Sequence, residues 1–233
     1  MYIVTGASGG LGRKVIEELV RREQCVVGLY GTNCPSTPWP TDTLYIRYEL
    51  TTSSNIMAKL VSRMPQIKDE DIHLIHLAGI TINASISKTT FAGIQQQFEV
   101  NCSGVLHLIR ELWPQMKEKQ FGRLIFVSSV VAHRPVFGAL GYSITKSAME
   151  GMVRGLLPEG IKNNILPFGI GLGYTEYGMI AQVPEAHQEA LKKTIPMGRF
   201  GNFEEVMNSI DFLINTPYMA GQILPLNGGL HLV

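Results

Sequence analysis

Short runs of apolar and β-branched residues alternate along the chain with longer amphipathic segments. Several of the short runs are almost continuously apolar, as is typical of strands buried on both faces. The runs that predict strands are Tyr2–Thr5, Cys25–Tyr30, Leu44–Tyr48, Ile72–Leu77, Arg123–Ser128, Lys162–Pro167 and Gln222–Leu226. The segments that predict helices are Leu11–Arg22, Ser53–Met64, Phe91–Lys119, Tyr142–Leu157 and Phe203–Asn215.

This alternation predicts an α/β protein in which right-handed crossovers join parallel strands. We therefore expect a doubly wound parallel sheet of about seven strands, a Rossmann fold. The chain shows no internal repeat and no low-complexity tract, so residues 1–233 are expected to form a single domain.

Two segments rich in glycine or proline interrupt the pattern. Gly31 to Pro40 contains three prolines, so we expect a loop rather than a helix there. Gly169 to Gly178 carries four glycines, which predict a second loop, and it leads into a polar segment, Glu185–Lys193, that predicts a short helix. Glycine-rich hinges beside a short helix suit a substrate lid, which we place at residues 174–195, although they suit an ordinary surface excursion equally well.

The composition is that of a globular protein, with 45% hydrophobic and 17% charged residues. The net charge is +1 and no basic run stands out, which argues against a nucleic-acid or membrane-surface partner. The N-terminal residues read as a strand rather than a signal peptide, and no apolar run reaches the roughly 20 residues that span a bilayer. Cys25, Cys34 and Cys102 show no metal-ligand spacing, so we expect free thiols, no metal site and a cytoplasmic protein.

The first predicted strand runs directly into a glycine-rich turn, Thr5 to Gly12 (TGASGGLG), and a predicted helix follows at once. Glycines allow a sharp turn and let a pyrophosphate approach the N–H groups at a helix N-terminus. A tight turn without a ligand is the alternative, but the position between strand and helix favours a dinucleotide site. The candidate residues are Gly6, Ser8, Gly9, Gly10, Leu11 and Gly12.

Further motifs follow in chain order and, with the glycine turn, resemble those of the short-chain dehydrogenase/reductase family. The turn matches T-G-x-x-x-G-x-G, Asn101 lies within FEVNCSG, Ser128-Ser129 ends a strand, and Tyr142 and Lys146 form Y-x-x-x-K. The segments IPMGRFGNFEEV and GQILPLNGG extend the similarity over essentially the whole chain. It is closest to the 3-oxoacyl-(acyl-carrier-protein) reductases. The resemblance implies an enzyme that interconverts a carbonyl and a secondary alcohol with a nicotinamide cofactor.

Tyr142 and Lys146 are four residues apart, so their side chains share one face of a helix. A nearby ammonium group favours the phenolate of a tyrosine and brings proton transfer within reach. The resemblance implies that Tyr142 is the proton donor and acceptor, that Lys146 also holds the nicotinamide ribose, and that Ser129 holds the substrate oxygen. Ser128 is the alternative if the register differs by one residue. Asn101 matches the asparagine that supports a water-mediated proton relay through the lysine.

The end of the second predicted strand, Tyr30 to Asn33 (YGTN), lacks the carboxylate that would bind a ribose 2′-hydroxyl and repel a 2′-phosphate. Its absence favours NADP, with NAD as the alternative. Arg13 or Thr32 could contact the phosphate, although Arg13 could equally face solvent. The resemblance adds cofactor contacts at Glu49, Leu50, Ala78, Gly79, Tyr142, Lys146 and Thr175.

The chain departs from the family pattern at three places. After the fourth strand, Asn-Asn-Ala-Gly is replaced by residues 76–79 (HLAG), and we interpret His76 as a strand-end histidine in preference to a substitute hydrogen-bonding group. After the sixth strand, the usual Pro-Gly becomes Pro167-Phe168-Gly169. Tyr142 and Asn164 are 22 residues apart, about four fewer than in the family, or roughly one helical turn.

The expected function is that of an NADPH-dependent ketoreductase similar to the 3-oxoacyl-thioester reductases, acting on a small carbonyl compound or alcohol, thioester-linked or free. Two alternatives stay open: a sugar or secondary-metabolite dehydrogenase, and a cofactor-binding regulatory or scaffold protein without turnover. We expect specificity to lie in residues 130–140 and in the lid, where His133 and Arg134 could meet an anionic group or solvent. The resemblance also implies a homodimer or homotetramer.

Overall fold

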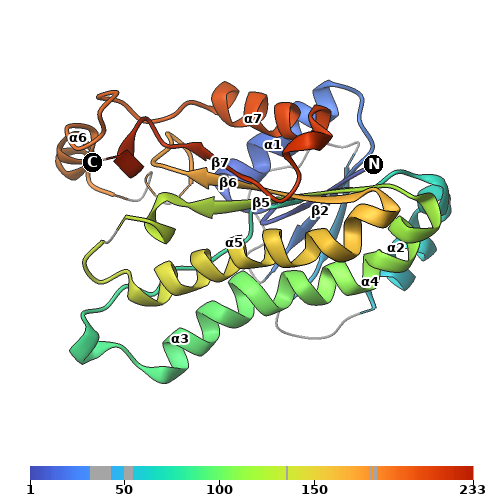
Figure 1. The fold of residues 1–233 in the computed structure, drawn as a ribbon, viewed down its shortest axis with the longest axis horizontal. Helices are drawn as coiled ribbons and strands as arrows, with labels where there is room; N and C mark the ends of the chain where they lie inside the picture. Colours follow the sequence, from blue (N-terminus) through green and yellow to red (C-terminus); the bar gives the residue numbers. More distant parts are fainter. Residues whose placement is uncertain (32–42, 50–54, 135, 179, 181–182, 233) are drawn as a thin grey trace.

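The computed structural model describes the chain except residues 32–42, 50–54, 135, 179, 181–182 and 233. Its centre is one sheet of parallel strands in the order β3-β2-β1-β4-β5-β6-β7 (Figure 1). This arrangement confirms the predicted doubly wound sheet of seven strands in a single α/β domain. The strands are β1 (Tyr2–Thr5), β2 (Val26–Tyr30), β3 (Thr43–Arg47), β4 (His73–His76), β5 (Gly122–Ser129), β6 (Ile165–Leu172) and β7 (Ile223–Leu226).

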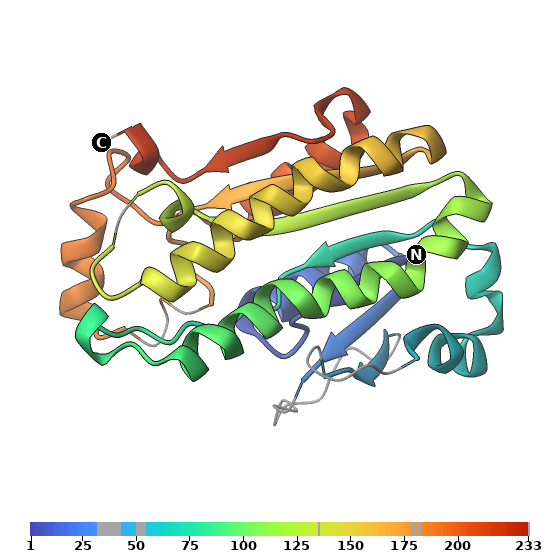
Figure 2. The same ribbon diagram turned by 60° about the horizontal axis from the view of Figure 1, so that its bottom comes forward.

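Helices cover both faces of the sheet (Figures 1 and 2). On one face Ile3 of β1 belongs to a buried cluster with residues of α2, α4 and α5, and on the other Val4 packs with α1 and α7. Neighbouring strand residues thus point to opposite layers, which is why the strands are apolar almost throughout. The helices are α1 (Gly10–Arg21), α2 (Ile56–Arg63), α3 (Phe91–Phe98), α4 (Gly104–Lys119), α5 (Leu140–Gly160), α6 (Glu185–Lys192) and α7 (Phe203–Asn215).

The strand order reverses between β1 and β4, which are neighbours in the sheet although β2 and β3 intervene in the sequence. The two strands pair in parallel from Tyr2 opposite His73 to Thr5 opposite His76. At such a reversal the connections leave towards opposite faces, and a crevice opens beyond the carboxyl ends of the strands. The glycine turn and the segment after β4 both begin at this edge.

Two predicted segments lie wholly or partly outside the described residues. The loop predicted for Gly31 to Pro40 is described only at Gly31, and Cys34 is not described. The helix predicted from Ser53 is described from Ile56, where α2 begins.

The segment Phe91–Lys119 is helical as predicted, but it is not one regular helix. Between α3 and α4 the residues Glu99–Ser103 form a short π-helix. A π-helical turn inserts one extra residue into the helix and is frequent at functional sites. Here the wide turn carries the buried Asn101.

The prediction for the sixth strand was wrong in its bounds. The strand β6 runs from Ile165 to Leu172 rather than from Lys162 to Pro167, so the segment Pro167-Phe168-Gly169 lies inside it and does not follow it. Gly169 is a packing glycine rather than a loop hinge, because a Cβ there would overlap the Ile223 side chain of β7.

Pro167 fits a central strand because it breaks no ladder bond. Its carbonyl accepts from the Gly221 N–H. A residue in a strand points its N–H to the same side as its carbonyl, and the β7 ladder begins only at Gly169, opposite Ile223. The missing N–H of Pro167 therefore lies before the part of β6 that pairs with β7.

The connection from α5 to β6 is short because Gly160 ends the helix against the next strand. A Cβ at Gly160 would overlap the Ile165 carbonyl oxygen. A single 3-10 turn, Ile161–Asn163, and the left-handed Asn164 at φ 54° complete the reversal. The close approach of Gly160 gives a structural reason for the reduced spacing between Tyr142 and β6.

We expect Gly160→Ala to lower the free energy of unfolding by about 1 to 3 kcal/mol, because backbone must move to admit the methyl group. The matched control is Gly155→Ala in the same helix, where nothing lies within 4 Å of the added Cβ. That change should raise stability by up to about 1 kcal/mol through helix propensity. Urea unfolding of both variants checks this, and equal effects would contradict the close contact.

Candidate active site

The candidate residues meet at the carboxyl edge of the sheet, around the β1–β4 reversal. The glycine turn follows β1, Ala78 and Gly79 follow β4, Ser129 ends β5, and Tyr142 lies in the first turn of α5. Four separate parts of the sequence thus contribute to one edge. This is where open α/β sheets bind their ligands.

The glycine turn is packed so closely that two of its glycines admit no side chain. Gly6 has φ 71°, and a Cβ there would lie 2.7 Å from the Ala78 nitrogen. A Cβ at Gly12 would overlap the Gly6 carbonyl oxygen. The absence of a side chain at Gly6 therefore lets the turn pack against the segment after β4. The absence of one at Gly12 lets α1 pack against the turn.

The start of α1 offers main-chain donors to a ligand. Gly9 and Gly10 are exposed at the turn, and Ser8 and Leu11 flank them. The helix has no side-chain cap at Gly9 and no acidic residue in its first turn. The N–H groups and the positive end of the helix dipole are thus available to a phosphate. The residues present fit the dinucleotide that the sequence predicts.

Tyr142 and Lys146 lie one turn apart on α5, as the four-residue spacing predicts. The Lys146 Nζ atom lies 5.5 Å from the centroid of the Tyr142 ring. Lys146 is buried, and its ammonium group donates to the Val127 carbonyl at 2.8 Å. This bond ties the lysine to β5 near the serine pair that ends the strand.

The structure distinguishes the two serines. Ser128 is buried and its hydroxyl lies 3.2 Å from the Lys146 carbonyl and 3.1 Å from Oε1 of Glu150, so it faces the body of α5. Ser129 is half-buried, and its side chain interacts with the Tyr142 phenol, lowering the pKa of that group against the effect of burial. The structure thus places Ser129, and not Ser128, at the tyrosine hydroxyl.

Asn101 fixes the segment that follows β4. Its Oδ1 accepts from the Ile80 N–H at 2.8 Å, and its Nδ2 donates to the Ile80 carbonyl and to Thr145 Oγ1, both at 3.0 Å. The Cβ position of Gly79 lies 3.4 Å from Asn101 Oδ1 and 3.7 Å from Lys146 Nζ. Asn101 and Lys146 therefore meet at Gly79, where a side chain would come between them.

Burial has the largest effect on the pKa values of Tyr142 and Lys146. Burial raises the pKa of Tyr142 to about 12, and hydrogen bonding to Ser129 acts in the opposite direction. Burial lowers the pKa of Lys146 to about 8, against an opposing electrostatic contribution from Cys102. Desolvation of Tyr142 is the larger of the two effects, so the neutral phenol is favoured over the phenolate in this structure. At neutral pH Tyr142 is a phenol and Lys146 is mainly an ammonium ion.

The other residues predicted to contact the cofactor differ in their surroundings and in whether the structure describes them. The Ala78 N–H donates to Thr5 Oγ1 at 3.2 Å beside the glycine turn. Glu49 follows β3 and forms an ion pair with Arg47 at 2.5 Å, and Leu50 lies outside the described residues. Thr175 is buried, and its hydroxyl donates to the Tyr177 carbonyl at 2.9 Å.

Of the two residues predicted as possible contacts of a 2′-phosphate, Arg13 and Thr32, the structure describes only the first. The Arg13 Nε atom lies 2.8 Å from Glu17 Oε1, in an ion pair along α1. Thr32 lies outside the described residues. At the end of β2, only Tyr30 and Gly31 of the four predicted residues are described, and neither carries a negative charge.

The described part of the predicted lid packs over the tyrosine. Ile180, Val183, Leu191 and Ile195 join an apolar cluster that includes the half-buried Tyr142. The lid also approaches the glycine turn, since a Cβ at Gly10 would lie 3.3 Å from the Gly178 nitrogen. The helix predicted at Glu185–Lys193 is confirmed as α6. The segment thus lies between the glycine turn and the tyrosine.

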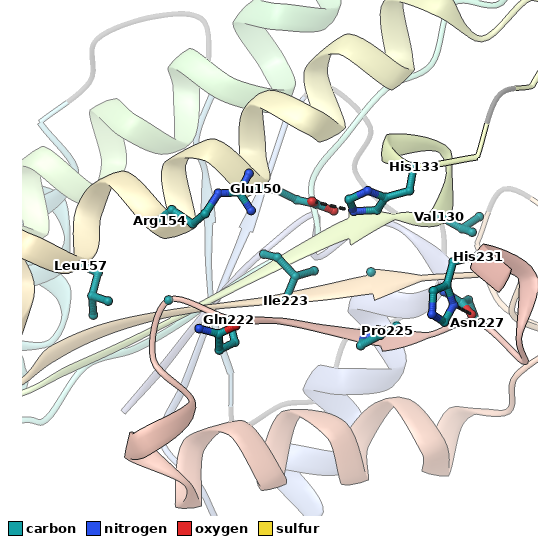
Figure 3. A pocket seen from close by; sticks show the side chains of 12 residues that line it. Val130, His133, Glu150, Arg154, Leu157, Gln222, Ile223, Pro225, Asn227 and His231 are labelled. Atoms are coloured by element: carbon teal, nitrogen blue, oxygen red, sulfur yellow. Dashed lines mark hydrogen bonds and ion pairs between the residues drawn. The ribbon is translucent and has the colours of Figure 1, made fainter.

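His133 does not face an open anion site. Its Nε2 atom lies 2.8 Å from Oε2 of the buried Glu150 (Figure 3). The interpretation of His133 as an anion-binding residue is therefore not supported, because a carboxylate already occupies that position.

A cavity of about 520 Å³ opens between α5 and β7, beside this pair. Arg154 and Ile223 line it together with the pair, but Tyr142, Lys146 and the glycine turn do not. Its size alone does not make it the reaction site, because the residues that can transfer a proton lie elsewhere.

Sequence reasoning missed two buried polar residues that support the site. Thr145 links Asn101 to α5, and Glu150 holds Ser128. Both lie on the inner face of α5, three and eight residues after Tyr142. A polar residue at such an inward position is the one signal that could have identified them.

Two kinds of feature are absent from the part of the chain that the structure describes. None of the described helices is both long and apolar enough to cross a membrane. Within the same residues, no group of three or more His, Cys, Asp or Glu side chains could hold a metal ion.

The fold and the glycine turn define a dinucleotide-binding α/β protein with a tyrosine–lysine pair at the carboxyl edge of its sheet. The family model for short chain dehydrogenases matches residues 1–188, and the chain belongs to this family. The protein is therefore an oxidoreductase that uses a nicotinamide cofactor and acts on a CH–OH group or the corresponding carbonyl.

Individual relatives agree with this membership over nearly the whole chain. The 3-oxoacyl-(acyl-carrier-protein) reductase FabG of Aquifex aeolicus is 27% identical over 238 residues, which cover 98% of this chain and 96% of the relative. Acetoacetyl-CoA reductase of Allochromatium vinosum is 30% identical over 243 residues, with 98% and 97% covered. The solved structure of 4-hydroxyisoleucine dehydrogenase complexed with NADH superposes with a TM-score of 0.84 at 19% identity, over 100% of this chain and 99% of that chain, and this likeness shows the fold alone.

Proposed function

We propose that the protein is an NADPH-dependent ketoreductase whose substrate is a 3-oxoacyl thioester or a similar ketone. The observation that carries the proposal is the Tyr142–Lys146 pair, with the buried Lys146 Nζ 5.5 Å from the centroid of the Tyr142 ring and Ser129 acting on the phenol. Relatives named as 3-oxoacyl-(acyl-carrier-protein) reductase and acetoacetyl-CoA reductase support the substrate class.

The cofactor would lie along the glycine turn, with its pyrophosphate at the N-terminus of α1 and its nicotinamide ribose near Tyr142 and Lys146. When bound, the nicotinamide supplies the hydride to the carbonyl carbon. Ser129 orients the carbonyl oxygen by hydrogen bonding, and Tyr142 donates its phenolic proton to that oxygen. Lys146 stabilises the resulting phenolate through its positive charge. The pKa of Tyr142, raised to about 12, keeps the proton on the tyrosine until the oxygen gains charge.

The surroundings of Tyr142 favour an acyl substrate over a sugar. The cluster above the ring is formed by Val130, Val131, Ile180, Ile195 and other apolar side chains. Such a wall gains free energy by covering a hydrocarbon chain, whereas a polyhydroxylated sugar would lose hydrogen bonds to water there. The lid and the residues after β5 are accordingly the proposed specificity elements.

NADP is the proposed cofactor because no carboxylate stands at Tyr30 or Gly31, where it would repel a 2′-phosphate. The 4-hydroxyisoleucine dehydrogenase structure holds NADH, so nucleotide preference has to be measured for this protein itself.

We also propose that two copies of the chain associate through α3, α4 and α5. These helices lie side by side along one flank of the molecule (Figure 2). They expose large apolar side chains that a soluble monomer rarely leaves to water. The exposed residues are Phe91, Phe98, Leu106, Leu140 and Ile144.

The first test is oxidation of NADPH and of NADH by purified protein against a panel of ketones that includes acetoacetyl-CoA. We expect consumption with NADPH that needs a ketone and falls by at least about a hundredfold in Tyr142→Phe, because the proton donor is lost. Tyr174→Phe, which removes a hydroxyl from the same cluster, is the matched control. Nucleotide binding without consumption across the panel would instead favour the regulatory or scaffold protein.

The pH dependence of reduction follows from Lys146. The ammonium form stabilises the Tyr142 phenolate, and a lysine with its pKa lowered to about 8 loses that proton as the pH rises through this value. We expect kcat at saturating substrate to fall by about tenfold per pH unit above it. Tyr142 stays protonated there, since its pKa is raised to about 12. A rate that stays constant to about pH 10 would show that the charge of Lys146 is not required.

For the proposed association, Leu106→Glu should convert a dimer or tetramer to a smaller species, because a carboxylate would be buried in the contact. Leu106 is 41% exposed in the single chain, so the fold itself should persist. Ala58→Glu, on exposed α2, makes the same charge change away from this flank. Light scattering coupled to gel filtration measures both, and an unchanged mass for Leu106→Glu would exclude this contact.

A further inference from the structure

Thr145 lies directly before Lys146 on α5, at a position of the Y-x-x-x-K motif for which the motif specifies no residue type. Its side chain is completely buried. A buried hydroxyl costs free energy unless it forms hydrogen bonds, and this one has two partners. Thr145 Oγ1 lies 3.0 Å from Asn101 Nδ2 and 2.9 Å from the Tyr142 carbonyl oxygen. The hydroxyl therefore connects the π-helical turn to the first turn of α5.

The chemistry of the partners fixes the direction of both hydrogen bonds. The Ile80 N–H donates to the Asn101 amide at 2.8 Å, so the atom on that side of the amide is its oxygen. The other end is then the nitrogen, which can only donate, and Thr145 Oγ1 accepts from it. A carbonyl oxygen can only accept, so the hydroxyl hydrogen of Thr145 is directed to Tyr142.

The hydroxyl of Thr145 also determines how the Asn101 amide is oriented. One N–H of the amide donates to the Ile80 carbonyl at 3.0 Å, and the other donates to Thr145. Without the hydroxyl, the second N–H would be left in a fully buried place. Turning the amide over would not help, because its nitrogen would then face the Ile80 N–H. Thr145 thus supplies the acceptor from α5 that completes the bonding of Asn101.

A second contact joins the main chain of Thr145 to the same π-helical turn. The Cys102 Sγ atom lies 3.3 Å from the Thr145 carbonyl oxygen, and a thiol is a weak donor. Two successive residues of the turn therefore bond to Thr145, one at its side chain and one at its main chain. Two such contacts oppose rotation of the helix about its axis, whereas a single contact would allow it.

Rotation of α5 matters because the helix carries both members of the proton-transferring pair. Tyr142 precedes Thr145 by three residues, and Lys146 follows it and donates to the Val127 carbonyl at 2.8 Å. Side chains end roughly 5 to 6 Å from a helix axis, so a rotation of about 10° moves them by about 1 Å. A displacement of about this size at a reacting group can reduce a rate by up to about a hundredfold.

We propose that Thr145 is a positioning residue whose hydroxyl orients the Asn101 amide and fixes the rotation of α5 that places the Tyr142 phenol and the Lys146 ammonium group at the sheet edge. The role rests on the proposed function, since the Tyr142–Lys146 pair is what this arrangement serves. Because its side chain is completely buried, Thr145 acts through Asn101 and the Tyr142 main chain and not on a substrate.

Three substitutions separate the hydroxyl from the rest of the side chain. Thr145→Val keeps the shape and replaces the hydroxyl by a methyl group, and Thr145→Ala removes the hydroxyl without placing a methyl group beside the amide. Thr145→Ser keeps the hydroxyl and loses only the methyl group. The matched control is Ser209→Ala on α7, which removes a buried hydroxyl that donates to the Glu205 carbonyl of its own helix at 2.8 Å, away from the site.

We expect kcat to fall by about tenfold or more in Thr145→Val and in Thr145→Ala, because the pair is displaced. KM and nucleotide affinity should change by less than about threefold, since the glycine turn and the lid are untouched. Thr145→Ser and Ser209→Ala should stay within about threefold of the wild type. Urea unfolding shows that each variant is folded. An unchanged kcat in Thr145→Ala, or an equal loss in Thr145→Ser, would overturn the proposal.

A second measurement does not depend on turnover. In protein labelled with nitrogen-15 asparagine, the side-chain amide signal of Asn101 is identified by its loss in Asn101→Ser. Its protons should exchange slowly with deuterium in the wild type and in Thr145→Ser, and at least about tenfold faster in Thr145→Val. Equal exchange in the wild type and Thr145→Val would overturn the proposal. If no ketone is reduced, the proposed function fails while this exchange still decides whether Thr145 orients the amide.

Discussion

The contact between the glycine turn and the segment after β4 is the constraint on which the site depends. Gly6 approaches the Ala78 main chain so closely that no side chain fits, and Thr5 Oγ1 accepts from two successive N–H groups of that segment. Both features lie where the strand order reverses. If this junction opened, the glycine turn and the segment that carries Gly79, beside which the Lys146 ammonium lies, would separate.

Burial sets the pKa values of the two side chains that can exchange a proton at this junction. Lys146 is enclosed between β5 and α5, and the same enclosure raises the pKa of Tyr142 and lowers that of the lysine. The two shifts leave a proton on each group at neutral pH, which suits the donation of a proton to a carbonyl oxygen. The reverse reaction would have to begin by removing the tyrosine proton.

The sequence predicts the order of strands and helices because each signal is local: an apolar run, a helical period, or a glycine turn between them. It does not predict the bounds of β6, since Gly169 looks like a hinge until Ile223 of a distant strand is placed against it. The π-helical turn at Asn101 carries no mark in the sequence. The sign of the Tyr142 pKa shift also escapes local reasoning, because desolvation depends on the assembled fold. His76 does end β4, but its hydrogen bond to Thr5 escapes local reasoning, because Thr5 is remote in sequence.

Two buried amides hold the loop after β4 at alternate residues. Asn101 bonds both main-chain groups of Ile80, and Gln97, also buried, accepts from the Ile82 N–H at 3.0 Å. Gln97 lies on α3 and Asn101 on the π-helical turn that follows, so one continuous helical run fixes one wall of the site. On the opposite side, Tyr174, Ile180, Val183, Leu191 and Ile195 pack in one apolar cluster with Tyr142. Directional bonds fix a single geometry, whereas apolar contacts tolerate repacking around different hydrocarbon chains. This division agrees with the proposal that the reacting groups stay fixed while residues of the lid determine which ketone is accepted.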